Sequence, residues 1–281
     1  MARNLKRIGH LDIPGGGQVV VAGDYAYVGH MVPPHGTTII DISDPSNPKV
    51  VSTIDLKDGY SHTHKARVVG DLLYTNFEQY DRHTLRRGDT LGNDRKRLAG
   101  ELGHNPPDPE LSADIGFDVD TIAKMDAAME RGYADGGFRI FDISDKAKPK
   151  LIKHQKTFGF GVHRFDGDEN YAYMSTEMEG YIGNILVIYD VKDPSNLTEV
   201  SRWNMPGQHL AGGEKPTWNS YKNRLHHALR VGDEMWAAVW HAGFRVIDVS
   251  DFTKPATVAE FDYHPPFPEP THTILPLPDT I

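Results

Sequence analysis

Cysteine is absent from the 281 residues, which excludes disulfides and thiolate chemistry. The chain also lacks the uninterrupted run of about 18 apolar residues that a membrane-spanning helix needs. Its first 17 residues, MARNLKRIGHLDIPGGG, carry positive charge but no apolar stretch behind it, so no secretory signal is predicted. These absences favour a cytoplasmic protein without a membrane partner.

An excess of positive charge is missing as well. Lys and Arg total 30 against 39 Asp and Glu, a net charge of −9, which disfavours nucleic acid as a partner. The compositional feature that stands out is the set of 15 histidines. Without cysteine, metal binding and acid–base chemistry must come from His, Asp and Glu.

One segment occurs four times: TTIIDISDPSNPKVV (37–51), GFRIFDISDKAKPKLI (137–152), NILVIYDVKDPSNLTEV (184–200) and GFRVIDVSDFTKPATV (243–258). Each copy has a β-branched strand that ends in Asp, a turn and a second strand. The turns are rich in residues whose side chains accept local backbone hydrogen bonds or fix φ. Each copy therefore predicts a pair of antiparallel strands.

A hairpin precedes each pair: GQVVVAGDYAYVGH (17–30), HKARVVGDLLYTNFE (64–78), HRFDGDENYAYMSTE (163–177) and HALRVGDEMWAAVW (226–240), with a fifth start at HTILPLPDTI (272–281). The unit is thus four antiparallel strands. Two consecutive starts, His226 and His272, are 46 residues apart. A period in the forties with four strands is typical of a β-propeller blade.

The third-strand sequences TTIID, FRIFD, LVIYD and FRVID resemble the LVIVD repeat, which names a family of bacterial β-propeller proteins. The resemblance implies an all-β propeller with about four blades and the start of another. Because such propellers generally have six or seven blades, we expect further blades C-terminal to this single domain (1–281). The segment NLKRIGHLDI (4–13) is expected to form the outer strand of a blade.

Four histidines occupy one position of the repeat, the first residue of the first strand: His64, His163, His226 and His272. Blade one has Gly17 there. The first strand of a propeller blade lines the central channel, so repeat symmetry predicts four imidazoles around one end of the axis. Because imidazole suits transition metals, we expect these rings to bind a divalent ion. Fe(II) is the leading candidate, and Mn, Zn and Cu are the alternatives.

Two carboxylates lie at the end of the second strand. Glu78 and Glu177 each follow a candidate histidine by fourteen residues, so we expect each to accept a hydrogen bond from a ligand imidazole. In blade four, Trp240 and His241 take that place, and His241 joins Glu78 and Glu177 as a candidate catalytic residue. Strand alternation is expected to point His62 and His227 away from the axis. The alternative is that the repeated histidines are structural, as in WD-repeat propellers.

Two insertions, 80–135 and 205–224, are predicted at the same end of the blades as the histidines. Residues 118–131 have helical spacing, and the second insertion contains Gly, Pro, Trp218 and Tyr221. Long loops in compact domains are usually lids or binding loops. We therefore expect a partly helical cap over the site, the alternative being an oligomer contact.

The leading functional hypothesis is a metal-dependent enzyme of oxygenase or lyase type that acts on a small organic substrate, an aromatic one included. The four-histidine arrangement is similar to the Fe(II) site of carotenoid-cleavage oxygenases, as an analogy of site chemistry. The second hypothesis is a non-catalytic scaffold that binds a protein or ligand on its capped face. Expected partners are the substrate, a second copy of the chain, or the remaining C-terminal blades.

Overall fold

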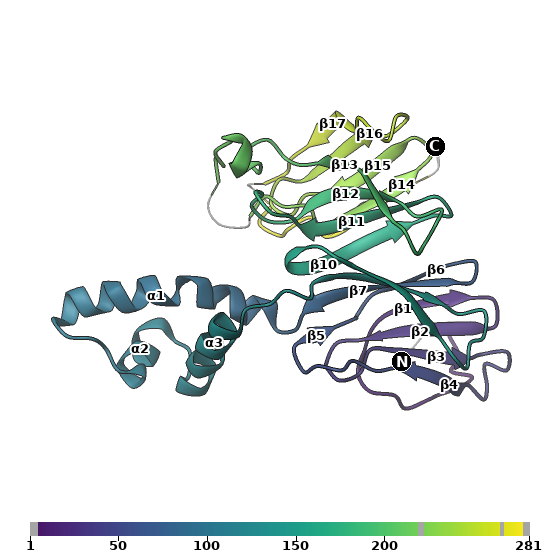
Figure 1. Cartoon of the computed structure of the whole chain (residues 1–281), viewed down its shortest axis with the longest axis horizontal. Coiled ribbons are helices and arrows are strands. Elements are labelled where there is room, and N and C mark those ends of the chain that lie inside the picture. The colour runs from purple at the N-terminus through teal and green to yellow at the C-terminus, as the bar shows by residue number, and fades with distance from the viewer. Residues whose placement is uncertain (1–4, 219–221, 265–266, 278–281) are drawn as a thin grey trace. The chain divides into compact units, whose positions relative to one another are not determined.

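The computed structural model describes residues 5–218, 222–264 and 267–277, with backbone only at 83–87 and 89. The chain divides into two compact units, residues 1–80 with 135–281, and residues 81–134 (Figure 1). The first is a β unit and the second is helical.

The β unit consists of four successive antiparallel blades, which confirms the predicted repeat. Within each blade, strands that follow each other in the sequence are neighbours in the sheet. The blades are β1 (Gly16–Ala22), β2 (Tyr25–His30), β3 (Thr37–Asp41) and β4 (Lys49–Ile54); β6 (Ala66–Val69), β7 (Leu72–Gln79), β8 (Gly137–Asp142) and β9 (Lys150–Lys156); β10 (Phe158–Gly167), β11 (Tyr171–Glu177), β12 (Ile185–Asp190) and β13 (Thr198–Trp203); β14 (His227–Val231), β15 (Glu234–Ala238), β16 (Phe244–Asp248) and β17 (Ala256–Phe261).

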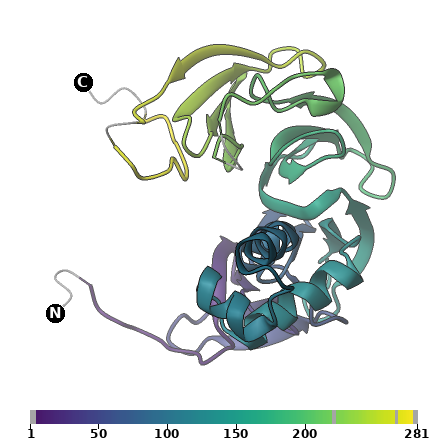
Figure 2. The same cartoon turned by 90° about the vertical axis from the view of Figure 1, so that its left-hand side faces the viewer.

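The first strand of each blade is the innermost, as a propeller requires. Strand β6 contacts both β1 and β10, and β10 contacts β14, so the first strands of successive blades meet. The fourth strands lie outside, and every residue of β17 is exposed. Figure 2 shows the four blades following one another along an arc, from purple to yellow.

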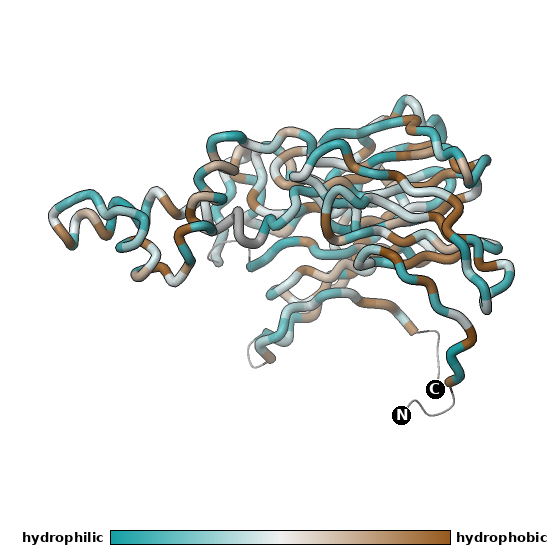
Figure 3. The backbone as a smooth tube through the Cα atoms, turned by 90° about the horizontal axis from the view of Figure 1, so that it is seen from below, coloured by the Kyte–Doolittle hydropathy of each residue, from teal (hydrophilic) through white to brown (hydrophobic). Residues whose placement is uncertain are grey.

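The turns after the third strands explain the repeated Asp. Asp41 accepts hydrogen bonds from the backbone N–H (2.9 Å) and the hydroxyl (2.6 Å) of Ser43, and Asp44 binds Ser46 in the same way. The same turn recurs at Asp142, Asp190 and Asp248. The hydrogen bonds from Ser43 hold the pKa of Asp41 below its ordinary value. Apolar stretches recur along the strands between these polar turns (Figure 3).

Both terminal strand predictions are wrong for the residues described. Residues 5–15 form no strand; instead Leu11 and Ile13 pack on the apolar side chains of Ala26, Val28 and Ile40. At the other end, Thr271 forms an isolated bridge with Trp240, and residues 272–277 form no strand. Residues 278–281 of the predicted fifth start lie outside the described part.

Blades two and three are joined through their backbones into one nine-stranded sheet. The long strand β10 pairs with β7 at Gly161 and Glu78 before it enters its own blade. A short strand β5 (Ser61–His62) pairs with the same end of β7, His62 opposite Glu78. This junction brings the ends of β5, β7 and β10 together.

The helical unit contains α1 (Arg82–Leu102), α2 (Asp108–Ile115) and α3 (Val119–Arg131). Helix α3 confirms the helix predicted at 118–131, and the Asp118 side chain caps it by accepting from the Thr121 N–H. The unit has its own core, formed by Leu91, Leu98, Leu111, Ile122 and Met125. None of the helices in the described ranges is both long and apolar enough to cross a bilayer.

Candidate metal site

Five imidazoles form a continuous row at the inner ends of the blades. Consecutive ring centroids lie 4.2, 5.7, 4.8 and 4.0 Å apart along the series His62, His64, His163, His226 and His272. The structure therefore places the four predicted ligands side by side in one row, and His62 extends the row at one end.

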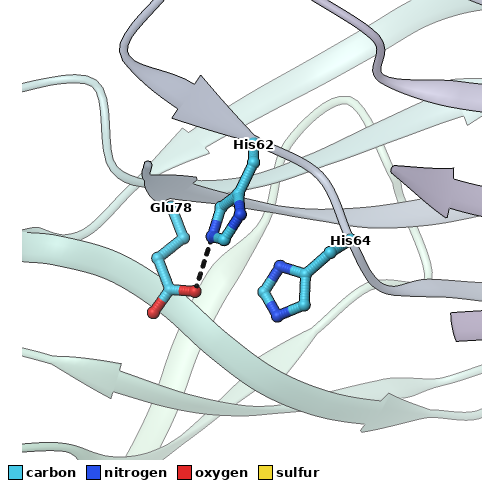
Figure 4. A group of neighbouring side chains, drawn as sticks. All are labelled: His62, His64 and Glu78. Carbon is cyan, nitrogen blue, oxygen red and sulfur yellow. Dashed lines mark hydrogen bonds and ion pairs between the residues drawn. The ribbon is translucent and has the colours of Figure 1, made fainter. Parts of the chain in front are cut away.

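His62, His64 and Glu78 form a buried group at one end of this row (Figure 4). Their potential ligand atoms all lie within 4.8 Å of one another, so the group could hold a metal ion. The expectation that His62 points away from the axis is wrong. It precedes His64 by two residues, and side chains two apart in an extended segment share a side.

Glu78 is the centre of the arrangement, and its side chain is almost fully buried. Its Oε2 atom lies 3.1 Å from Nε2 of His62 and 3.2 Å from Nδ1 of His163. The sequence placed Glu78 beside an imidazole, as found. Glu78 also contacts an imidazole of the neighbouring blade, His163 of blade three, because β10 pairs with β7.

His163 owes its orientation to an irregularity in β10. Val162 pairs with Thr176 and Arg164 with Ser175, so His163 is an extra residue in the ladder. Bulges of this kind re-aim a side chain and are common next to functional sites. Here the bulge places Nε2 of His163 3.0 Å from Nε2 of His226. Two nitrogen ligands that each lie about 2.1 Å from one ion, with a right angle between them at the ion, are also about 3.0 Å apart.

His226 and His272 form the other end of the row. His226 is buried, and its Nδ1 donates to the carbonyl oxygen of His272. The Trp240–Thr271 bridge brings His272 to this place. The ring of His272 is exposed and lies beside Arg164, with Nε2 3.3 Å from the guanidinium. A positive neighbour and open solvent make His272 the weakest ligand candidate.

Burial keeps the central imidazoles neutral. Loss of hydration lowers the pKa of His64 well below its ordinary value and outweighs the opposite effect of Glu78. Loss of hydration, reinforced by His163 and His272, lowers the pKa of His226 in the same direction. Neutral imidazole is the form that binds metal, so both rings are in that form near pH 7.

Asn76 fixes the ring of His64. Its Oδ1 accepts from the Lys65 N–H (2.9 Å), while its Nδ2 donates to the Val162 carbonyl (3.2 Å) and lies 3.2 Å from Nδ1 of His64. Asn76 was not predicted from the sequence, where its only signal is its place on the strand that carries Glu78.

Glu177 lies differently from Glu78. Its Oε2 accepts a hydrogen bond from the Phe160 N–H (2.8 Å) and lies against Gly159. Glu78 contacts the histidine of the following blade, so the corresponding partner of Glu177 would be His226. The two ring nitrogens of His226 face His163 and the His272 carbonyl instead. Glu177 thus supports the entry of β10 into blade three.

His241 and His227 lie away from the row. The ring of His241 packs beside that of His264, with centroids 5.4 Å apart, and the backbone N–H of His241 donates to the Lys222 carbonyl. His227 forms a hydrogen bond with the backbone of Phe165, and burial lowers its pKa to about 4.

Gly17 replaces histidine in blade one for a steric reason. A Cβ atom at Gly17 would lie 2.7 Å from the carbonyl oxygen of His64, and one at Gly29 would lie 2.5 Å from that of Thr63. The Gln18 N–H donates to the same His64 carbonyl. Blade one therefore forms the wall on which the segment 63–65 rests.

The loop 205–224 is anchored on blade three. Gln208 is buried and donates to the carbonyls of Ile182 and Asn184, and His209 stacks on Tyr181 with centroids 4.4 Å apart. At its end Arg224 covers the ring of Trp240, which lies 5.1 Å from His226. Tyr221, noted from the sequence, lies outside the described residues.

Four stretches of the chain match the LVIVD repeat: residues 16–55, 132–157, 168–205 and 232–262. Each stretch coincides with strands of one blade. Among curated proteins, none matches this chain.

Several solved structures are similar to this chain at low identity. A candidate 6-phosphogluconolactonase from Bacteroides uniformis is 11% identical, with 92% of this chain and 57% of that chain covered and a TM-score of 0.51. Apo AztD from Citrobacter koseri is 12% identical, with 92% and 49% covered and a TM-score of 0.44. The designed protein Ika4 is 6% identical, with 88% and 98% covered and a TM-score of 0.44. The chain spans about half the length of the two natural proteins.

Proposed function

We propose that this LVIVD-repeat β-propeller protein binds a divalent transition metal ion at the imidazole row and uses it in an enzyme reaction on a small organic molecule. The observation that carries the proposal is the buried group of His62, His64 and Glu78, with ligand atoms within 4.8 Å of one another. The group continues through Glu78 into His163. Burying a carboxylate costs free energy unless a cation or hydrogen bonds compensate for its charge, and a metal ion would do so.

The donor chemistry favours Fe(II), with Mn, Zn and Cu as alternatives. Nitrogen from imidazole combined with carboxylate oxygen suits first-row divalent metals. When bound, such an ion would polarise a substrate oxygen or activate O₂. The protein would orient the ligand rings and exclude water from them, since His62, His64 and Glu78 are each at most 3% exposed.

The substrate would approach from the exposed end of the row. Trp240 lies beside His226 there, and Arg224 lies over its ring. An aromatic face next to a cation suits an organic molecule that carries a carboxylate or a carbonyl. Oxygenase and lyase reactions both use such substrates, and the helical unit remains our proposal for a lid. A cytoplasmic location and a second copy of the chain as partner remain proposals of the same kind.

The second candidate function is a non-catalytic scaffold. It is favoured by the protein partners of the ring nitrogens, namely Asn76 on His64, the Met31 carbonyl on His62 and the His272 carbonyl on His226. In that case the histidines stabilise the junction between blades, and the protein acts by binding a partner.

Metal analysis of protein purified without an affinity tag tests the proposal. We expect a stoichiometric transition metal that is lost when His163→Ala is introduced and retained in His227→Ala. His227 is the matched control because it is a partly buried histidine next to His226 whose hydrogen bond goes to the backbone of Phe165. Protein that takes up none of Fe(II), Mn(II), Zn(II) or Cu(II) would refute the enzyme proposal in favour of the scaffold.

A further inference from the structure

A second polar site lies on the innermost strands, further along them than the imidazole row. It is a pocket of about 330 Å³ whose lining includes Arg67 of β6, Asp166 of β10 and Arg230 of β14. Each of these residues follows one histidine of the row by three or four positions in the sequence. Because a strand rises about 3.3 Å per residue, the pocket begins roughly 10 Å along the strands from the imidazoles. It is therefore separate from the candidate metal site.

Two ion pairs line this pocket. Nη2 of Arg67 in blade two lies 3.2 Å from Oδ1 of Asp166 in blade three. Nη1 of Arg230 in blade four donates to Oδ2 of Asp168 at 2.8 Å, and the Tyr173 hydroxyl donates to the same oxygen at 2.6 Å. Three blades thus contribute to the walls, and the charges of the two arginines and two aspartates balance.

The two carboxylates differ in how many hydrogen bonds they receive. Asp168 also accepts from the backbone N–H groups of Asn170 and Tyr171, each at 2.9 Å, so its charge is well compensated. Asp166 is only 8% exposed, and within the described residues its side chain has one polar contact, the ion pair with Arg67. Burying a carboxylate costs free energy unless hydrogen bonds or charges compensate for it. Oδ2 of Asp166 is therefore an acceptor that a ligand can use.

Both arginines retain donors for a ligand. Arg230 uses Nε for the Gly232 carbonyl and Nη1 for its other hydrogen bonds, and no acceptor in the described part of the chain contacts its Nη2. Arg67 forms its ion pair through Nη2, and its side chain is 47% exposed. A guanidinium group is a planar fork of donors that matches a carboxylate. The pocket thus offers guanidinium donors close to a carboxylate oxygen that can still accept.

We propose that this pocket binds a small zwitterion, a molecule that carries both a carboxylate and an ammonium group, as amino acids do. The ligand carboxylate would accept from Arg67 and Arg230, and its ammonium group would donate to Asp166. A simple anion would leave the Asp166 carboxylate without a donor, and a simple cation would face two guanidinium groups, so the mixed lining disfavours both. The pocket volume is at the small end of the usual range for ligand sites. The proposal does not depend on the metal function.

Calorimetric titration of the wild-type protein tests the proposal with glycine, 4-aminobutyrate and 6-aminohexanoate, which carry the two charges at increasing separation. Each is compared with the acid that lacks its amino group and the amine that lacks its carboxylate. We expect at least one zwitterion to bind with a dissociation constant of about 1 mM or lower, and its acid and amine to bind at least roughly tenfold more weakly. An acid or amine that binds as tightly as its zwitterion would overturn the proposal, as would the absence of saturable binding by all three zwitterions.

Arg67→Gln tests whether the ligand binds in this pocket. Arg67 is half exposed and forms a single ion pair, so we expect the variant to fold. Loss of a charged hydrogen-bond donor should weaken binding of the zwitterion by roughly tenfold or more. Arg202→Gln is the matched control, because Arg202 pairs with Glu199 on the outer strand β13. Equal affinities of the two variants would overturn the assignment to this pocket.

Asp166→Asn separates the two ends of the ligand. The change removes the charge that attracts the ammonium group and leaves both arginines in place. We expect weaker binding of the zwitterion and equal or tighter binding of the matching acid. Unchanged affinity for the zwitterion would refute the role of Asp166. If circular dichroism shows that a variant has not folded, the wild-type titrations with zwitterion, acid and amine decide.

Discussion

Oε2 of Glu78 in the second blade lies 3.2 Å from Nδ1 of His163 in the third, although the two residues are 85 positions apart in the sequence. The strands that carry them pair directly, Glu78 opposite Gly161. The distance between carboxylate and imidazole is thus fixed by backbone hydrogen bonds as well as by side-chain packing. A change that separates β7 from β10 should disturb the site and the fold together.

Gly161→Ala is expected to show this coupling. Gly161 has φ of +93°, and a Cβ atom there would lie 2.3 Å from the Phe77 carbonyl oxygen. Left-handed backbone and overpacking each cost about 1–3 kcal/mol, so we expect a loss of roughly 2–6 kcal/mol in the free energy of unfolding, together with weaker metal binding. The control is Gly15→Ala, because a Cβ atom there meets nothing within 4 Å. Equal denaturation midpoints for the two variants would contradict the prediction.

Glu78→Gln should reduce metal affinity while the blades stay intact. The change removes the charge of the buried carboxylate but keeps its shape and one oxygen. We expect a loss of at least roughly 10- to 100-fold in affinity for Zn(II) or Fe(II), measured by competition with a chelator. Glu177→Gln is the comparison, since Glu177 binds the Phe160 N–H; an equal loss in both variants would argue against a distinct role for Glu78.

Removal of the helical unit should leave metal binding in place. Residues 81–134 have their own core, and the strands on either side, β7 and β8, pair up to Phe77 and Gly137. A short Asn-Gly turn can therefore join Tyr80 to Asp135. We expect the shortened protein to fold and bind Zn(II) within about threefold of wild type, by calorimetry, while substrate turnover falls. Undiminished turnover would contradict the lid.

The stability of the metal-free protein should decrease as the pH falls below about 6.5. Burial lowers the pKa of His227 to about 4, and Arg164, His272 and Lys65 act in the same direction. Between pH 6.5 and 4 the unfolded chain binds a proton at His227 that the folded chain does not, which costs about 1.4 kcal/mol per pH unit. His227→Gln should remove this part of the slope in urea unfolding measured from pH 7 to pH 4.5. An unchanged slope would show that His227 is hydrated in the folded protein.

The blades could be predicted from the sequence because each repeat encodes its own turns and strands. The Asp–Ser contacts that end the third strands are local, so Asp41 and Ser43 alone indicate the end of such a strand. Helix α1 was missed for the converse reason. Its interior contains Gly88, Gly92 and Gly100, which are poor helix formers, and many charged residues.

The site could be predicted only in part, because repeat symmetry gives positions and not contacts. It indicated His163 and Glu78, and it favoured His64 over His62. The bulge that turns His163 and the pairing of β10 with β7 depend on neighbours from another blade. The Asn76 orientation depends on Lys65 and Val162 together. Such contacts are tertiary, and the spacing of residues along the chain does not specify them.

The shared nine-stranded sheet constrains how this repeat protein can evolve. Propeller genes can gain or lose blades by duplication, since each blade normally contacts its neighbours through interchangeable side chains. A new blade inserted between the second and third copies here would have to break the Gly161–Glu78 pairing and separate the carboxylate from its imidazole. Duplications elsewhere in the array would leave that pairing untouched. Blades two and three should therefore be inherited as an inseparable pair, while the number of the others is free to vary.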